Sequence, residues 1–282
     1  MRNPLPKIVG KGLLAGTLIF TLVGCASISQ LATEAEKALD EGAGVNDVIS
    51  ADAPFRGSPS EKYADGAAGI VIPEPTYERW FSKADTAWAY KKTRQLLEAR
   101  SLDTTTLLGG GPDAYAKALD PEARSFFLKG LDHKDDDKNT RYAVTSFPPG
   151  KVELVGSVVK VRGKLSAEPK FVEGERELHV TQESRFVYPV RPKGKPGPII
   201  RVMVYSKTVY RFWRDKPRAR LRVWEGDHLD GWNANAQCNT ADGFIHPDFS
   251  LTDSGGSGPA DDAYGDSSRK LKEGECGSVT GV

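Results

Sequence analysis

Apolar positions in residues 83–100 follow a helical period. Small or apolar side chains recur there every three or four positions: Ala89, Thr93, Leu96 and Leu97. This spacing predicts an amphipathic helix with one buried face. Ser82 is placed to accept a hydrogen bond from a backbone N–H of the first turn, and Asp85 suits the positive end of the helix dipole.

Two shorter helices are expected next. A run of three glycines at 109–111 ends the connection, and Pro112 suits the first position of a helix that runs to Leu119. A third helix begins at Asp120-Pro121. Its apolar side is formed by Phe126, Phe127 and Leu131. The acidic stretch 132–139 lacks the central Gly and the closing Glu of an EF-hand, so we expect a solvated loop.

From residue 152 onward, apolar and polar side chains alternate, which is the period of a strand. The predicted strands are 152–165, 177–190, 199–213 and one that contains Leu221 and Val223. The first has apolar residues on both parities, so it is either covered on both faces or bulged near Gly156. Gly/Pro-rich connections such as 192–198 join long strands, which indicates an antiparallel sheet.

Helices that precede strands predict an α+β fold, with N-terminal helices packed on a curved antiparallel sheet. This order of elements resembles that of the NTF2-like superfamily. The resemblance implies a sheet that forms a cone around the first helix, with an open end through which a ligand or partner enters. Such folds include both enzymes and interaction modules, so the resemblance does not select a function.

The N-terminus has the features of an export signal. Basic residues precede an apolar stretch that is too short to span a bilayer. The stretch ends at residues 22–25, Leu-Val-Gly-Cys, which resemble the lipobox of bacterial lipoproteins. The resemblance implies that residues 1–24 are removed and that Cys25 receives a lipid, which anchors the protein on the extracytoplasmic face of the cell membrane. A signal peptide without lipid attachment is the alternative.

The remaining chain divides into three parts. Residues 25–62 are expected to be a lipid-anchored spacer, residues 63–250 the α+β domain, and residues 251–282 a flexible, acidic, Gly/Ser-rich tail. The mature region is also similar to uncharacterised lipoproteins of high-GC Gram-positive bacteria, through stretches such as 102–110 (LDTTTLLGG) and 144–147 (VTSF). That resemblance supplies no catalytic residues.

The formal net charge of +1 conceals a segregation of sign. Between Arg185 and Arg222, twelve Lys or Arg residues accompany one acid, whereas from Glu225 onward eleven acids accompany three basic residues. We expect the acidic tail to screen the basic segment, within one molecule or between neighbours. The alternative is attraction of the basic segment to anionic lipid headgroups or wall polymers, because the anchor holds the domain near both. Nucleic acid is not an expected partner of an exported protein.

The cysteines suit an oxidising compartment. If Cys25 carries lipid, Cys238 and Cys276 remain as an even pair, which predicts a disulfide that ties the tail to the domain. Zinc binding is the alternative, but two isolated thiols without a close pair or suitably spaced histidines make a poor ligand set. No metal or cofactor is therefore expected.

Candidate chemistry is limited to histidines beside carboxylates. Asp227-His228, and His246 with Asp242, fall near or beyond the end of the last predicted strand, and such pairs can transfer protons or bind metals. They could equally be loop residues, since neither cluster has the spacing of a named motif. Trp232 belongs to a series of Trp residues among arginines that could stack on sugars, although core packing is commoner. Asp227, His228, Trp232 and His246 are the candidate ligand-binding residues, and no catalytic residue is assigned.

These patterns favour a membrane-anchored, extracytoplasmic lipoprotein that acts as a non-enzymatic binding or interaction module of the cell envelope. Its expected partners are the membrane, through Cys25, and an envelope protein or anionic wall polymer. The alternative is a small extracytoplasmic enzyme of isomerase or dehydratase type. In that case His228 or His246 and a neighbouring Asp would serve as acid and base. A buried Asp–His pair in the mouth of the cone would favour the enzyme.

Overall fold

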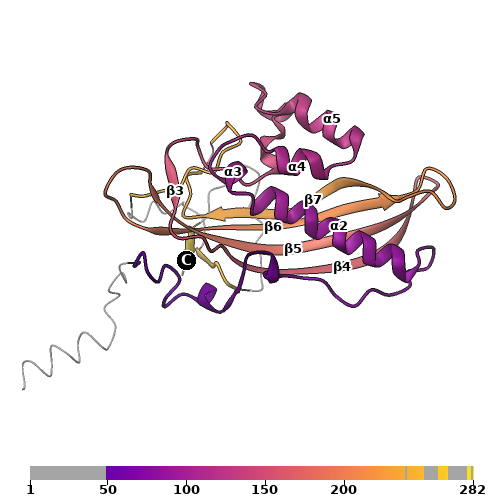
Figure 1. Cartoon of the computed structure of the whole chain (residues 1–282), viewed down its shortest axis with the longest axis horizontal. Helices are drawn as coiled ribbons and strands as arrows, with labels where there is room; N and C mark the ends of the chain where they lie inside the picture. The colour runs from indigo at the N-terminus through magenta and orange to yellow at the C-terminus, as the bar shows by residue number, and fades with distance from the viewer. Residues whose placement is uncertain (1–48, 239, 251–259, 266–277, 281) are drawn as a thin grey trace, which may run out of the picture. The chain divides into compact units, whose positions relative to one another are not determined.

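The computed structural model describes residues 49–238, 240–250, 260–265, 278–280 and 282. Helices come first in this part of the chain and long strands follow, so the predicted α+β class is confirmed (Figure 1). The signal peptide 1–24, Cys25 and Cys276 lie outside the described residues. Lipidation and the Cys238–Cys276 disulfide therefore stay predictions.

Helix α2 (Lys83–Ser101) matches its predicted range within a residue. The Ser82 hydroxyl accepts from the Asp85 N–H at 3.2 Å, and Asp85 Oδ2 accepts from the Ser82 N–H at 2.9 Å. This capping box satisfies two backbone donors that would otherwise lack a partner. The buried face carries the expected stripe and continues to Arg100, which is 6% exposed.

Short helices follow α2 in the chain: α3 (Thr104–Leu107), α4 (Asp113–Ala118) and α5 (Pro121–Gly130). The sequence pattern does not predict α3, a single turn capped by the Asp103 side chain. Helix α4 begins after Pro112, which is its N-cap rather than its first residue. Helix α5 begins at Pro121 as predicted. Asp120 does not cap it, because its Oδ2 accepts from the Val223 N–H at 2.8 Å.

The apolar side predicted for α5 is only partly buried. Phe127 is 3% exposed, but Phe126 is 61% exposed and its ring contacts that of Trp224. The described residues also form 3-10 turns: η1 (Pro59–Lys62), η2 (Gly66–Gly69), η3 (Asp136–Lys138) and η4 (Thr140–Ala143). The acidic stretch 132–139 is largely exposed, as expected for a solvated loop.

Seven strands form the main sheet: β1 (Ala64–Asp65), β2 (Ile70–Val71), β3 (Val152–Leu154), β4 (Lys160–Val172), β5 (Glu175–Pro192), β6 (Ile200–Trp213) and β7 (Arg222–Ala234). The order is β1-β4-β5-β6-β7, all antiparallel, while β3 pairs with β5 and the short β2 runs parallel to β4. Strands β8 (Ala260–Asp262) and β9 (Ser278–Thr280) form a separate parallel pair. In the part of the chain described, the sheet is open, and the cone that we expected is not seen.

Two strand predictions need correction. The predicted strand 152–165 is two strands, because Gly156 adopts a φ of +74° that interrupts the extended chain between β3 and β4. The last strand extends to Ala234, so His228 lies within β7 and not beyond it. Strands β5 and β6 have their predicted ranges within two residues, but the parity predicted to be polar is buried in part: Arg185 and Arg201 are 5% and 7% exposed.

The two faces of the sheet are covered by different parts of the chain. Helix α2 lies across one face (Figure 1), where the alternate residues of β5 are at most 1% exposed: Leu178, Val180, Phe186, Tyr188 and Val190. Phe55 and Tyr264 pack with Val187 and Met203 in a second cluster. Phe55 lies before the predicted domain and Tyr264 lies in the predicted tail, whereas Val187 belongs to β5 and Met203 to β6. The packed domain thus includes residues that come before and after the predicted range 63–250.

The basic segment 185–222 forms ion pairs with acids of neighbouring elements. Ion pairs join it to acids of α2, α5, β3 and β5: Arg214–Asp85, Arg222–Glu122, Arg191–Glu153, Arg211–Glu177 and Lys207–Glu183. In the described part of the tail, Arg185 donates to the backbone carbonyls of Ala263 and Gly265, at 3.2 and 2.6 Å. The contacts seen with the tail thus use backbone oxygens, and its screening by tail carboxylates stays a prediction.

Gly69 allows β2 to approach β4 closely. A Cβ at this position would lie 2.1 Å from Val161 O and 2.6 Å from Val161 Cβ. We expect Gly69→Ala to lower the free energy of unfolding by about 1 to 3 kcal/mol, because the β4 backbone has to move. Urea denaturation of the two proteins measures the effect.

Gly111→Ala is the matched control for Gly69→Ala. Its added Cβ would meet no atom closer than 3.8 Å, and its φ lies outside the left-handed region. The control should unfold close to the wild-type midpoint. Equal midpoints for Gly69→Ala and wild type would contradict the close approach of β2 to β4.

Candidate functional site

A buried ion pair connects helix α2 with strand β7. Arg100 Nη1 lies 2.9 Å from Glu225 Oε1, and the two side chains are 8% and 14% exposed. The same Nη1 donates to the Tyr210 hydroxyl at 3.2 Å, and the Tyr115 hydroxyl donates to Glu225 Oε2. The four residues come from α2, α4, β6 and β7. This cluster, called the Arg100–Glu225 network below, therefore joins the helices to the sheet.

Burial and charge act in opposite directions on Glu225. Burial alone would raise its pKa, but Arg100 and hydrogen bonds from His228 and Tyr115 outweigh it and lower the pKa to about 2. Burial, together with the Glu225 charge, raises the pKa of Tyr115 and of Tyr210. The carboxylate is consequently ionised and both hydroxyls are neutral at any pH near neutrality: that of Tyr115 donates to Glu225, and that of Tyr210 accepts from Arg100.

An irregularity in β7 brings His228 onto the same face as Glu225. Residues three apart in a regular strand point to opposite faces. Here Glu225 pairs with Tyr210 and His228 pairs with Thr208, so three steps along β7 oppose two along β6. This bulge places His228 Nε2 3.3 Å from Glu225 Oε1, and its Nδ1 3.2 Å from Thr208 Oγ1. Bulges commonly redirect side chains in this way.

Thr208, His228 and Glu225 place a hydroxyl, an imidazole and a carboxylate in series. That order of groups is used by hydrolases to activate a nucleophile. Thr208 is 0% exposed, however, so its oxygen cannot reach a substrate. His228 is the most exposed of the three, with 54% of its side chain exposed against 14% for Glu225. The series is therefore suited to orienting His228 and not to attack by Thr208.

The other predicted residues of this strand do not join His228. Asp227 is an exposed residue of the bulge. Trp232 pairs with Tyr205, and their ring centroids are 5.3 Å apart. The Arg185 guanidinium lies 4.7 Å from the centroid of the Tyr205 ring. Trp232 thus packs in a Tyr–Arg stack, which agrees with a packing role more than with a shared site with His228.

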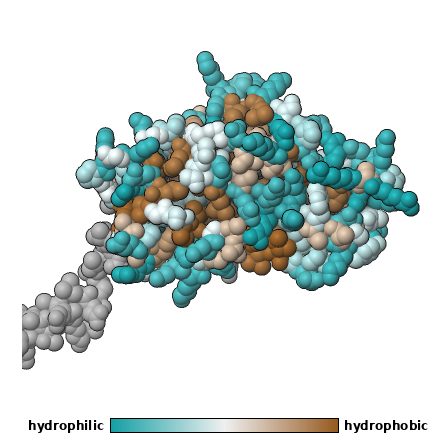
Figure 2. Space-filling model, in the orientation of Figure 1, coloured by the Kyte–Doolittle hydropathy of each residue, from teal (hydrophilic) through white to brown (hydrophobic). Residues whose placement is uncertain are grey.

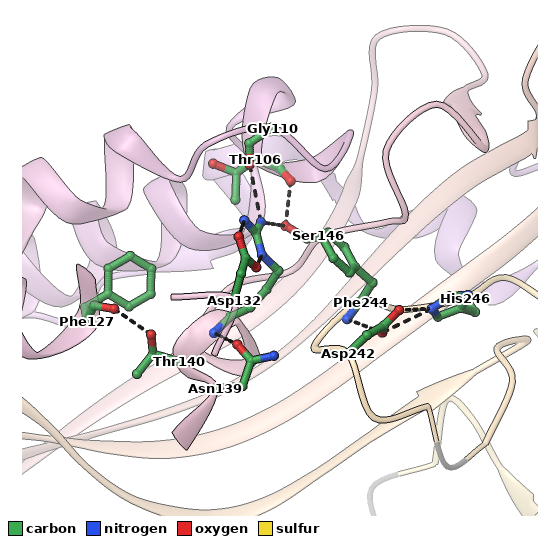
Figure 3. Close-up of polar contacts among 11 residues, drawn as sticks. Thr106, Gly110, Phe127, Asp132, Asn139, Thr140, Ser146, Asp242, Phe244 and His246 are labelled. Atoms are coloured by element: carbon green, nitrogen blue, oxygen red, sulfur yellow. Dashed lines mark hydrogen bonds and ion pairs between the residues drawn. The ribbon is translucent and has the colours of Figure 1, made fainter. Parts of the chain in front are cut away.

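His246 forms a second histidine–carboxylate pair, in the segment after β7. Its Nε2 lies 2.9 Å from Asp242 Oδ2, and Asp242 Oδ1 also accepts from the Phe244 N–H at 3.0 Å. Figure 3 shows Asp242, Phe244 and His246 next to one another on this segment. The structure pairs His228 and His246 with different carboxylates, so they form two sites rather than the single constellation that the sequence allowed.

The segment of His246 rests against a buried arginine, Arg141 of η4. Arg141 forms an ion pair with Asp132 and donates to Gly110 O and Ser146 Oγ, each at 3.3 Å. Its guanidinium also lies 4.7 Å from the centroid of the Phe244 ring. Figure 3 shows Asp132, Gly110 and Ser146 converging on one point. Arg141 thus fixes the acidic stretch, the glycine turn and the segment after β7 together.

The outer side of α2 borders an open cavity of about 750 Å³. Its polar lining includes Glu98, Asp103 and Lys117, and neither His228 nor His246 contributes to it. Among the described residues, no group of three or more His, Cys, Asp or Glu is arranged to hold a metal ion. The cavity and the histidines are therefore separate features.

Sequence reasoning did not identify the Arg100–Glu225 network. One signal was available, since Arg100 continues the buried stripe of α2, three residues after Leu97. A charged side chain on a buried stripe requires a partner, because an unpaired buried charge is costly. The partner itself lies 125 residues away in the sequence. No spacing rule connects the two.

Comparison with known proteins does not place the chain in a family. No protein-family model, no curated protein and no solved structure gives a significant match to the chain. Within the described ranges, none of the helices combines the length and the apolar character required to cross a bilayer. The functional argument therefore rests on the residues and the geometry given above.

Proposed function

We propose that this protein is a lipid-anchored, extracytoplasmic binding module of the cell envelope that works without catalysis. The compartment is inferred from residues 22–25, whose Leu-Val-Gly-Cys sequence resembles a lipobox. The absence of catalysis is inferred from the Arg100–Glu225 network. This network is the observation that carries the proposal.

Glu225 is a poor acid–base catalyst in this setting. General bases work best when their pKa lies near the ambient pH, whereas the ion pair with Arg100 lowers the pKa of Glu225 to about 2. The carboxylate already forms an ion pair with Arg100 and accepts a hydrogen bond from the Tyr115 hydroxyl. The network instead fixes α2 and α4 on the sheet, which provides a rigid scaffold for loops that bind a partner.

A small extracytoplasmic enzyme is the second candidate, and the contact of His246 with Asp242 favours it. Such a pair could move a proton if a substrate bound beside it. Thirty per cent of the His246 side chain and 49% of that of Asp242 are exposed. A catalytic pair is expected in a more enclosed site. The binding module is therefore the better-supported function.

Membership of the NTF2-like superfamily is also a proposal. It is supported by a long amphipathic helix, α2, that packs on a sheet of four long antiparallel strands. The open edge of the described sheet does not distinguish this family from other α+β folds. The proposed function does not depend on it.

Fatty-acid labelling tests the lipid anchor. We expect the full-length protein, produced in a bacterium with lipoprotein processing enzymes, to incorporate an alkyne fatty acid and to sediment with membranes. Cys25→Ser should lose all label, because the thioether to lipid requires the thiol. The readout is in-gel fluorescence after coupling to a dye.

Cys238→Ser is the matched control, since it replaces a cysteine elsewhere in the chain and should keep the full label. Label that persists in Cys25→Ser, or that is missing from the wild-type protein, would overturn the proposed anchor.

A further inference from the structure

We infer that the loop between β6 and β7, residues 214–221, binds a phosphate-bearing polymer of the cell envelope. This inference deepens the proposed function and rests on it for the compartment in which the polymer is met. The loop and the first residue of β7 contain five basic side chains: Arg214, Lys216, Arg218, Arg220 and Arg222. They accompany a single acid, Asp215.

Two of the five cations hold the loop in place. Arg214 Nε donates to Ala219 O at 2.7 Å across the loop, and its guanidinium also pairs with Asp85 at the start of α2. Arg222 pairs with Glu122 of α5 at 2.7 Å and with Asp215 at 3.3 Å. Asp85, Glu122 and Asp215 are therefore already occupied by these two arginines.

The remaining cations are available to a ligand. Lys216, Arg218 and Arg220 are exposed, and within the described chain neither Lys216 nor Arg218 forms an ion pair. The Arg220 guanidinium lies 5.4 Å from the centroid of the Trp88 ring, which holds it on the surface of α2. Three positive charges without acidic partners thus occupy one short loop.

Another basic side chain lies near the loop. Lys92, on α2, has a pKa lowered first by burial and further by the charges of Arg220 and Arg124, while Asp120 opposes the shift. The loop lies at the right-hand end of the sheet in Figure 1, and the same end is mainly hydrophilic in Figure 2. A cluster of like charges on a hydrophilic surface attracts polyanions.

The composition of the loop favours a polymer over a lipid surface. Its one large apolar side chain, Leu221, is 4% exposed, so the loop has no apolar group to insert into a bilayer. Aromatic rings instead lie beneath guanidinium groups, as Trp88 does under Arg220 and Trp213 under Arg222. The stack on Trp88 supports the exposed Arg220 cation on a flat ring, and the stack on Trp213 helps Arg222 to hold the loop, which suits contact with phosphates along a flexible chain.

Binding of poly(glycerol phosphate) tests the inference. The lipidated protein, purified in detergent, should bind the fluorescently labelled polymer, with an affinity that falls as salt is added. Lys216→Gln combined with Arg218→Gly should weaken binding by about tenfold, because two unpaired charges are lost. Glycine is chosen at Arg218 because that residue has a φ of +67°, a conformation that glycine adopts without strain. The melting temperature should therefore change little.

The control replaces Lys193 and Lys195 with Gln in the β5–β6 loop, which is exposed and lies at the opposite end of the antiparallel strands. It removes the same charge and should keep wild-type affinity. Equal weakening by both pairs, no binding by the wild type, or preferential binding of anionic vesicles over the polymer by the unlipidated Cys25→Ser protein would each overturn the inference. Polymer binding is measured apart from lipid labelling, so failure of the loop site and failure of the anchor are distinguishable.

Discussion

Replacing Arg100 with methionine is expected to lower the free energy of unfolding by about 3 to 5 kcal/mol. The change would leave the Glu225 carboxylate buried without its cation, because the only other contacts described for it are the hydroxyl of Tyr115 and the half-exposed His228. Urea denaturation at pH 7, followed by tryptophan fluorescence, measures the loss.

Arg94→Met is the matched control on the same helix. Arg94 pairs with Glu98 at 2.8 Å, but the two side chains are 34% and 41% exposed. Exposed pairs of this kind contribute roughly 0.5 kcal/mol or less, so the control should be nearly neutral. Equal effects of the two substitutions would show that the Arg100–Glu225 pair is not desolvated.

A double variant keeps the test informative if Arg100→Met does not fold. Replacing Glu225 with methionine in the same protein removes the uncompensated charge, and apolar replacements of buried ion pairs are often tolerated. We expect the double variant to recover much of the lost stability. No recovery would mean that Arg100 acts through packing and not through its charge.

Lowering the pH should reduce the free energy of unfolding of the wild-type protein, because Glu225 becomes protonated. Its pKa falls from 4.5 to about 2 on folding, so its contribution to stability is full above pH 4.5 and is lost as the pH falls towards 2. A depression of this size corresponds to about 3 kcal/mol. The free energy of unfolding, measured in urea at a series of pH values, should show this loss over and above that of the remaining carboxyl groups.

Glu225→Gln isolates this contribution. At pH 7 the variant should be less stable, because Arg100 loses its counter-charge. The difference between wild type and variant should shrink by about 3 kcal/mol between pH 7 and pH 2, since the wild-type carboxylate then takes up a proton. A difference that stays constant across this range would contradict the lowered pKa of Glu225.

Local sequence patterns predicted the regular elements well. Helix α2 depends on contacts three or four residues apart and on a cap within the first turn, and both are visible in the sequence from Ser82 to Leu97. Strands β5 and β6 carry apolar residues on alternate positions near each end, such as Val180 and Tyr188, which indicates the face that packs with α2. The ranges of α2, β5 and β6 therefore follow from the chain alone to within two residues.

The candidate sites did not follow from local patterns. The sequence placed Asp227 beside His228, but the bulge in β7 turns His228 towards Glu225 instead. A bulge depends on how β7 pairs with β6, which no pattern within β7 expresses. The contact of Trp232 with Tyr205 is likewise set by the register of the same two strands.

What the sequence by itself determined is the α+β order, the start of α2, the alternation of the long strands and a lipobox-like stretch at residues 22–25. Each of these depends on residues within a few positions of one another. The tertiary structure alone decided that Arg100 meets Glu225, that Arg214 and Arg222 pair with Asp85 and Glu122, and that Lys216 and Arg218 form no ion pair with any residue described. The physical reason is that ion pairs form between charges close in space, and folding brings together residues more than a hundred positions apart.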